Sequence, residues 1–116
     1  MKGNMNTAEA IIALAALAQE SRLAIFRLLV LAGPEGLAAT KIGGELGAPN
    51  SSMSFHLKEL THAGLITSRQ QGRFIIYAAN FDKMNSLLAF LTENCCGGLP
   101  CTVRPQPAGT LEFTVA

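Results

Sequence analysis

Residues 51–65 read SSMSFHLKELTHAGL, and this stretch decides the fold. Met53, Leu57 and Leu60 recur at helical spacing, so they predict a single apolar stripe along a helix. Small polar residues precede the stripe, as is typical of a helix N-cap, and Gly64 is a common helix end. We therefore predict a capped helix with one buried side.

The residues that follow predict a β-hairpin. Residues 66–80, ITSRQQGRFIIYAAN, contain two β-rich runs on either side of Gln71-Gly72. Arg69 and Arg73 flank the tip of this hairpin. They are either DNA contacts or charges that keep a solvated edge strand from aggregating. We favour DNA contact, because a helix suited to reading DNA comes directly before them.

A shorter helical pattern lies upstream. In residues 37–47, LAATKIGGELG, Ile42 and Leu46 share a face and Gly47 ends the run. Two helices joined by a few residues around a glycine are the outline of a helix-turn-helix. Together with the basic hairpin they predict a winged helix-turn-helix, a mainly α fold with a β-hairpin wing.

Another helix is expected before this motif. Residues 20–33, ESRLAIFRLLVLAG, have a helical apolar pattern that stops at Gly33-Pro34. The apolar positions of the pattern are Leu23, Phe26, Leu29 and Val30. We expect Arg22 and Arg27 on the outer side of this helix.

The chain has 116 residues, of which 49% are hydrophobic and 15% charged, and this suits one compact domain. We treat residues 1–116 as one domain, with a core at about 8–93 and a cysteine-bearing tail at 94–116. Residues 8–18, AEAIIALAALA, are apolar nearly all the way round, and a monomer of this size can hardly cover such a helix. The run is too short to cross a bilayer, so we expect a soluble, cytoplasmic protein with no membrane partner.

A net charge of +1 gives no global basic field, so a nucleic-acid surface must be local. With the apolar stripe of residues 51–65 turned inward, Ser51, Phe55, Lys58 and His62 face outward. Hydroxyls and free amides in the first turn suit phosphate oxygens. The expected DNA-binding residues are Ser51, Ser52, Ser54, Phe55, Lys58, Arg69 and Arg73.

We expect different surroundings for the three ring-bearing side chains of the helix predicted within residues 51–65. Phe55 either presses against a thymine methyl group or covers part of the hairpin. His56 lies beside the buried stripe, so we expect a hydrogen-bonded histidine at the edge of the core. His62 is expected to be solvated.

The chain's three cysteines, Cys95, Cys96 and Cys101, are bunched after the last helical pattern, and such spacing favours ligation or redox chemistry over a disulfide framework. Three soft thiolates with no histidine nearby select a thiophilic ion such as trivalent arsenic, whereas structural zinc usually takes a fourth ligand. Antimony meets the same conditions, and an organoarsenical needs only Cys95 and Cys96. A redox pair, or thiols that are incidental to the tail, also stays open. Adjacent helical residues diverge by about 100°, so both thiols face one centre only if the helix ends or distorts there.

The stretches ALAQESRLAIFRLL (16–29), SSMSFHLKELTHAGLI (51–66) and GRFIIYAAN (72–80) resemble the ArsR/SmtB family of winged-helix metalloregulators, above all its arsenic-responsive repressors. The resemblance implies a homodimer that pairs the first and last helices, binds operator DNA and releases it when an inducer binds. It implies no constitutive cofactor. The interface residues it implies are Ile11, Leu14, Leu17, Met84, Leu87, Leu88 and Leu91.

The sequence departs from other branches of that family. Residues 36–44, GLAATKIGG, hold no cysteine, and the last helix offers Asp82 and Glu93 but no histidine for zinc. The three thiols therefore form the metal site that we expect. An enzyme is not expected, because there is no glycine-rich phosphate loop and a helix C-terminus is the wrong pole for an oxyanion. Two further functions stay open for this chain, a thiol-based redox repressor and a metalloid chaperone.

Overall fold

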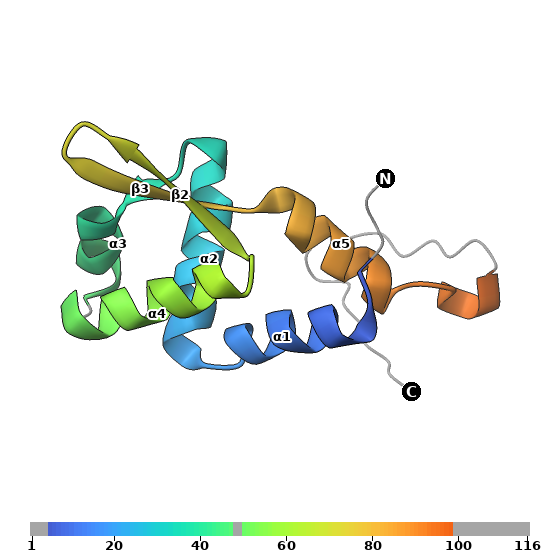
Figure 1. Ribbon diagram of the computed structural model, residues 1–116. Helices are drawn as coiled ribbons and strands as arrows, with labels where there is room; N and C mark the ends of the chain where they lie inside the picture. Colours follow the sequence, from blue (N-terminus) through green and yellow to red (C-terminus); the bar gives the residue numbers. More distant parts are fainter. Residues whose placement is uncertain (1–4, 48–49, 99–116) are drawn as a thin grey trace, which may run out of the picture.

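The computed structural model describes residues 5–47 and 50–98, and the order of its elements is that of a winged helix (Figure 1). Its helices are α1 (Thr7–Leu17), α2 (Glu20–Ala32), α3 (Ala39–Leu46), α4 (Asn50–His62) and α5 (Phe81–Leu91), with short 3-10 turns η1 (Gly33–Glu35) and η2 (Cys95–Gly98). Its strands are β1 (Leu37–Ala38), β2 (Ile66–Gln71) and β3 (Phe74–Ala79). The predicted fold class, mainly α with a hairpin wing, is confirmed.

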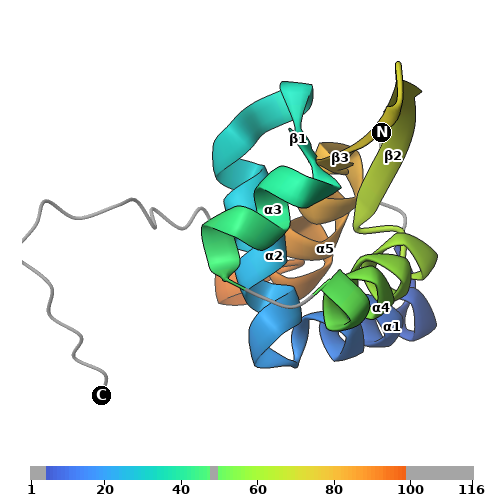
Figure 2. The same ribbon diagram turned by 90° about the vertical axis from the view of Figure 1, so that its left-hand side faces the viewer.

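The described part of the molecule has two ends, and different elements lie at each. Figure 1 shows α3, the start of α4 and the tip of the wing at one end, and η2 at the other. Figure 2 looks onto the first end and shows the wing rising above α4, with α1 beside α4. We call the predicted DNA-binding residues of α4 and the wing the reading surface. It lies far from the two described cysteines.

The wing is an antiparallel sheet with the strand order β1-β3-β2. The β2–β3 register runs from Ile66↔Ala79 to Gln71↔Phe74, so the loop is Gly72-Arg73, one residue later than predicted. Gly72 has a φ of +67° while Arg73 does not have a positive φ, as in a type II′ hairpin turn. The short strand β1, which pairs with β3 on its other side, was not predicted.

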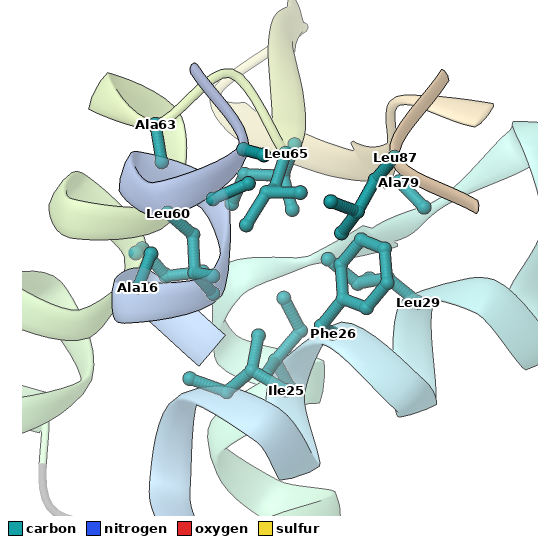
Figure 3. Packing of buried hydrophobic residues seen from close by; sticks show 14 of the residues in the cluster. Ala16, Ile25, Phe26, Leu29, Leu60, Ala63, Leu65, Ala79 and Leu87 are labelled. Carbon is teal, nitrogen blue, oxygen red and sulfur yellow. The ribbon is translucent and has the colours of Figure 1, made fainter. Parts of the chain in front are cut away.

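The core forms around α2 and the inner face of α4 (Figure 3). The predicted stripe of α4 is buried: Met53 and Leu57 are 3% exposed and Leu60 is fully buried. Full burial of one such side chain stabilises the fold by about 1.5–3 kcal/mol, so the stripe fixes the rotation of α4. The opposite face of α4 is thereby turned outward.

The buried face of α2 differs in part from the prediction. Phe26 and Leu29 are buried as expected, but Ile25 is fully buried and Leu23 is 43% exposed. Apolar residues surround most of α2, so the residues of this helix alone do not fix which of them faces the core. Val30 is half-buried against that core.

In α1 the small side chains face the core and the large ones face outward. The residues that α1 buries are Ala10, Ala13 and Ala16. Ile11 is 59% exposed and Ile12 55% exposed, although both are larger and more apolar than alanine. Alanines let α1 lie close to its neighbours, and its outer apolar face stays uncovered. No helix in the described residues is both long and apolar enough to span a membrane.

Candidate nucleic-acid interface and thiol site

The outer face of α4 carries most of the predicted DNA-binding residues. Ser51, Ser54, Phe55 and Lys58 are exposed, and Phe55 keeps 54% of its surface in solvent. Ser52 is half-buried, so it offers less surface than its neighbours. Helical spacing places Ser51, Phe55 and Lys58 on the side opposite the buried stripe, as predicted, with Ser54 at the edge of that face.

A shallow hollow of about 290 Å³ lies where α4 meets the wing. Its lining residues are Ala39, Ser54, Leu57, Lys58, Thr61, His62, Ser68 and Tyr77. Hydroxyl, ammonium and imidazole groups from α4 and from both long strands of the wing thus surround one recess. Such donors suit phosphate or base-edge oxygens. His62 is exposed, as expected.

The aromatic ring of Phe55 contacts the imidazole ring of the next residue, His56. The Phe55 and His56 ring centroids are 5.7 Å apart in an edge-on arrangement with a 61° interplanar angle. This contact supports the Phe55 ring on one side and leaves more than half of its surface open.

The two wing arginines are held differently. The Nη2 of Arg69 donates to the carbonyl oxygen of Glu35 at 3.0 Å and to Oε1 of Gln71 at 3.3 Å. Arg73 lies in the exposed two-residue loop. Arg69 therefore ties the wing to η1, while Arg73 is the more available cation for a phosphate.

His56 is half-buried and hydrogen-bonded, as predicted, and its partner is Arg22. The Nη1 of Arg22 lies 3.4 Å from Nδ1 of His56, and its Nε donates to the carbonyl oxygen of Ala16 at 2.7 Å. A guanidinium group only donates, so Nδ1 of His56 is the acceptor of this hydrogen bond. The expectation that Arg22 lies outside was wrong, because its side chain caps the end of α1 and reaches α4.

The chain after α5 turns sharply and brings two thiols together. The helix ends at Leu91, and both Asn94 (φ 58°) and Cys96 (φ 59°) have left-handed backbones. The Sγ atoms of Cys95 and Cys96 are exposed and 3.6 Å apart, well beyond the length of a disulfide, about 2.05 Å. Asparagine adopts this conformation readily, whereas at a residue such as Cys96 it costs about 1–3 kcal/mol, and such strained residues tend to cluster at functional sites. The helix thus ends before both thiols, and Cys101 lies outside the described residues.

Within the described residues no group of three histidine, cysteine or acidic side chains is placed to hold a metal ion. The two described thiols therefore supply part of the predicted three-thiol site. The third ligand that we predict, Cys101, lies outside those residues.

The predicted interface residues fall into three groups. Ile11, Leu14, Leu88 and Leu91 are each more than 40% exposed. Leu17 and Met84 are half-buried and pack against the chain's own core. The expectation for Leu87 needs correction, because Leu87 is 6% exposed and offers almost no surface to a second copy. Ile12 was missed, although the all-round apolar pattern of α1 already included it.

Comparisons with known proteins agree with this geometry. Residues 17–69 match a helix-turn-helix domain family. A relative from Halobacterium salinarum that carries the name of an arsenical resistance operon repressor, ArsR, is 41% identical over 64 residues, which are 55% of this chain and 49% of that protein. A relative from Bacillus subtilis named as the uncharacterized regulator YceK is 40% identical over 58 residues. The chain thus spans only about half the length of these two relatives, 49% and 57%.

Solved structures match over more of their length. An ArsR-like transcriptional regulator from a Rhodococcus species is 30% identical, with a TM-score of 0.65 over 72% of this chain and 76% of that chain. HlyU from Vibrio cholerae is also 30% identical, with a TM-score of 0.61 over 76% of this chain and 96% of that chain. The fold and the relatives are those of DNA-binding transcriptional regulators, not of enzymes.

Proposed function

Because the chain belongs to the ArsR family of winged-helix transcriptional regulators, we propose that it represses transcription as a homodimer on operator DNA and releases the DNA when trivalent arsenic binds Cys95, Cys96 and Cys101. The observation that carries the inducer is the approach of two exposed thiols to 3.6 Å directly after α5. DNA binding, dimerisation, the inducer and release are supported by separate arguments.

DNA binding is supported by the outer face of α4 and the hollow beside the wing. A helix that enters the major groove needs its apolar stripe behind it and polar or basic groups in front. Lys58 and Ser54 are exposed on this face, and Arg73 extends the basic surface onto the wing loop. Phe55, more than half exposed, suits contact with a thymine methyl group.

Dimerisation is supported by the apolar residues that the chain leaves in solvent at both terminal helices. Ile11 and Ile12 of α1 and Leu88 and Leu91 of α5 each expose more than half of their surface. A second copy that covers this surface removes apolar area from water at about 25 cal/mol per Å². A two-fold pair would then set the distance between its two α4 helices.

Arsenic is supported by the chemistry and the location of the thiols. The backbone leaves helical geometry at Asn94 and Cys96, so two sequence-adjacent thiols point to one place. Three thiolates balance the charge of a trivalent metalloid, and a neutral complex suits the negative end of a helix dipole. The short segment of residues 97–100, GGLP, precedes the third thiol, Cys101.

Release follows from the position of this site at the end of α5. Closing three thiols around one atom rearranges the turn after Leu91 and shifts α5 within the proposed interface. Two reading helices must lie about 34 Å apart to enter successive major grooves, so a modest shift weakens DNA binding. Allosteric effects of this kind change affinity by about 5- to 150-fold.

The first experiment measures the fluorescence anisotropy of labelled promoter DNA with the full chain, titrated with arsenite, antimonite, methylarsenite, cadmium and zinc. We expect arsenite to raise the Kd for DNA by about 5- to 150-fold in the wild type. Cys95→Ser and Cys96→Ser should abolish the effect and leave the Kd without inducer unchanged. Cys101→Ser separates three-thiol from two-thiol inducers, because it should lose the arsenite response and keep that to methylarsenite. Wild type that stays on its DNA when saturated with arsenite, or serine variants that respond like it, would contradict the proposal.

A thiol redox switch is the second candidate, favoured by the same approach of Cys95 and Cys96. Oxidation would join the two sulfurs in a disulfide that the turn after α5 must accommodate. The anisotropy assay with diamide in place of metalloids distinguishes the two. Release by diamide without release by arsenite would support the redox switch over arsenic sensing.

A further inference from the structure

The end of α4 and the start of α5 are joined by one side chain, Asn80. Its Nδ2 donates to the carbonyl oxygen of Gly64 at 3.0 Å, just after α4 ends. Its Oδ1 accepts from the backbone N–H of Lys83 at 3.2 Å and so caps α5. Its backbone N–H donates to the carbonyl oxygen of Leu65 at 2.8 Å. The two ends of the side-chain amide thus hold two different helices.

A second contact between the same two turns involves Lys83. Gly64 has a left-handed φ of +78°, and a Cβ added to it would lie 3.2 Å from Cε of Lys83. The Lys83 side chain therefore lies across the residue that follows α4. Its ammonium group is also close to the C-terminus of α4, where a positive charge is favourable.

The helix α5 connects this junction to the thiols. It has 11 residues and thus a length of about 16 Å at 1.5 Å per residue. Asn80 caps its first turn, and Cys95 follows soon after its last residue, Leu91. Figure 1 shows the end of α4 and the start of α5 both near the middle of the described part of the molecule, between the reading surface and η2. Asn80 and the described cysteines thus lie at opposite ends of one helix.

We propose that Asn80 is the positioning residue that transmits the state of the cysteine site from α5 to the reading helix α4. The Nδ2 bond to Gly64 persists in both states and makes the end of α4 follow α5 when the inducer moves it. This inference rests on the proposed arsenic response and adds the path through which that response reaches the DNA surface.

The chain offers a variant that cuts this link and keeps the rest of the junction. Asn80→Asp retains an oxygen that caps α5, because aspartate is as good an N-cap as asparagine. It also retains the backbone bond to Leu65, and it loses the amide group that donates to the Gly64 carbonyl oxygen. Asn80→Ser is the second variant, since serine also caps a helix and its hydroxyl is too short to replace the amide.

The control is Asn85→Asp on the same helix. Asn85 is exposed, and no side-chain hydrogen bond joins it to α4 in the described residues. It receives the same chemical change and the same change in net charge. A loss of response that appears at residue 80 and not at residue 85 therefore reports the bond to Gly64.

The measured quantity is the ratio of the Kd for promoter DNA with saturating arsenite to the Kd without it. Arsenite occupancy is read separately, as protection of the thiols from Ellman's reagent. We expect the ratio to fall by about fivefold in Asn80→Asp and Asn80→Ser, because α4 no longer has to follow α5 once the bond is lost. A factor of about five corresponds to the free energy of one hydrogen bond, about 1 kcal/mol. The Kd without arsenite and the thiol protection should match the wild type, and Asn85→Asp should match it throughout.

An unchanged ratio in both residue-80 variants, with thiols fully protected, would overturn the transmission role. Loss of DNA binding in the absence of arsenite, by folded Asn80→Asp and Asn80→Ser, would overturn it as well, because Asn80 would then only shape the reading surface. If the wild type itself does not bind promoter DNA, or binds and is not released, the proposed function fails instead. Failure of the proposed function would thus be seen in the wild type, whereas failure of the transmission role would be seen only in the residue-80 variants.

Discussion

A single side chain, Arg22, joins three helices. It belongs to α2, caps the last turn of α1 through the carbonyl oxygen of Ala16, and contacts His56 on α4. The last turn of α1 has no basic residue of its own, so the guanidinium group supplies the charge that a helix C-terminus favours. The rotation of α4 about its axis is thereby tied to α1 as well as to the core.

Arg22→Met keeps the length of the side chain and removes every donor. A hydrogen bond to a charged group contributes about 1.5–3 kcal/mol, and partial exposure of Arg22 lowers that, so we expect the free energy of unfolding to fall by about 1–2 kcal/mol. Urea unfolding at one fixed protein concentration measures the change. Arg27→Met is the control, because Arg27 is exposed on the same helix and should change stability by less than about 0.5 kcal/mol. Equal effects of the two substitutions would remove the structural role assigned to Arg22.

Among the elements, α1 and α5 carry the apolar surface that the proposed dimer needs. Ile11→Lys and Leu88→Lys should each weaken the dimer about 10- to 100-fold, since every substitution occurs twice and each side chain, already about half covered in the monomer, loses about 0.8–1.5 kcal/mol of burial at the interface. Analytical ultracentrifugation measures the dimer Kd, and circular dichroism should show an unchanged fold. Leu31→Lys provides the comparison, because Leu31 on α2 is 83% exposed and outside the proposed interface. A dimer weakened equally by Leu31→Lys would argue for a different interface.

The same elements show how far the sequence predicts the fold. The stripe of α4 was predicted correctly because Met53, Leu57 and Leu60 recur at helical spacing in a helix whose other residues, Phe55 apart, are polar. In α1 nearly every position is apolar and in α2 most are, so only packing decides that Ala13 faces inward while Ile12 and Leu23 face outward. Strand β1 was missed because two residues carry no pattern without their partners on β3.

The candidate site divides in the same way. Outward residues of α4 such as Lys58 follow from helical spacing alone. The bond from Arg22 to His56 and that from Arg69 to Glu35 join residues that are 34 positions apart, so local patterns do not report them. The approach of Cys95 to Cys96 depends on left-handed backbones at two non-glycine residues, which the sequence does not indicate.

For the whole molecule, a net charge of +1 limits how much of the DNA affinity can be electrostatic. The positive charge that matters is local, on α4 and the wing, where Arg69 is tied down by its bond to Glu35 and Arg73 lies in the exposed loop. We therefore expect the affinity for promoter DNA to fall with salt, with a modest slope to which Arg73 contributes strongly. Each neutralised phosphate adds about 0.9 to the slope of log K against log salt, so two copies of Arg73 account for about 2.

Arg73→Gln tests this distribution of charge. For this variant, the slope of log K for promoter DNA against log salt is measured by anisotropy at several potassium chloride concentrations. It should be smaller in magnitude than that of the wild type by about 2. Arg27→Gln lowers the net charge of the chain by the same amount from α2, away from the proposed DNA surface, and should leave the slope unchanged. Identical slopes for Arg73→Gln and the wild type would mean that the wing loop does not contact phosphate. The hollow between Lys58, His62 and Ser68 would then remain as the place where the wing and α4 meet the duplex.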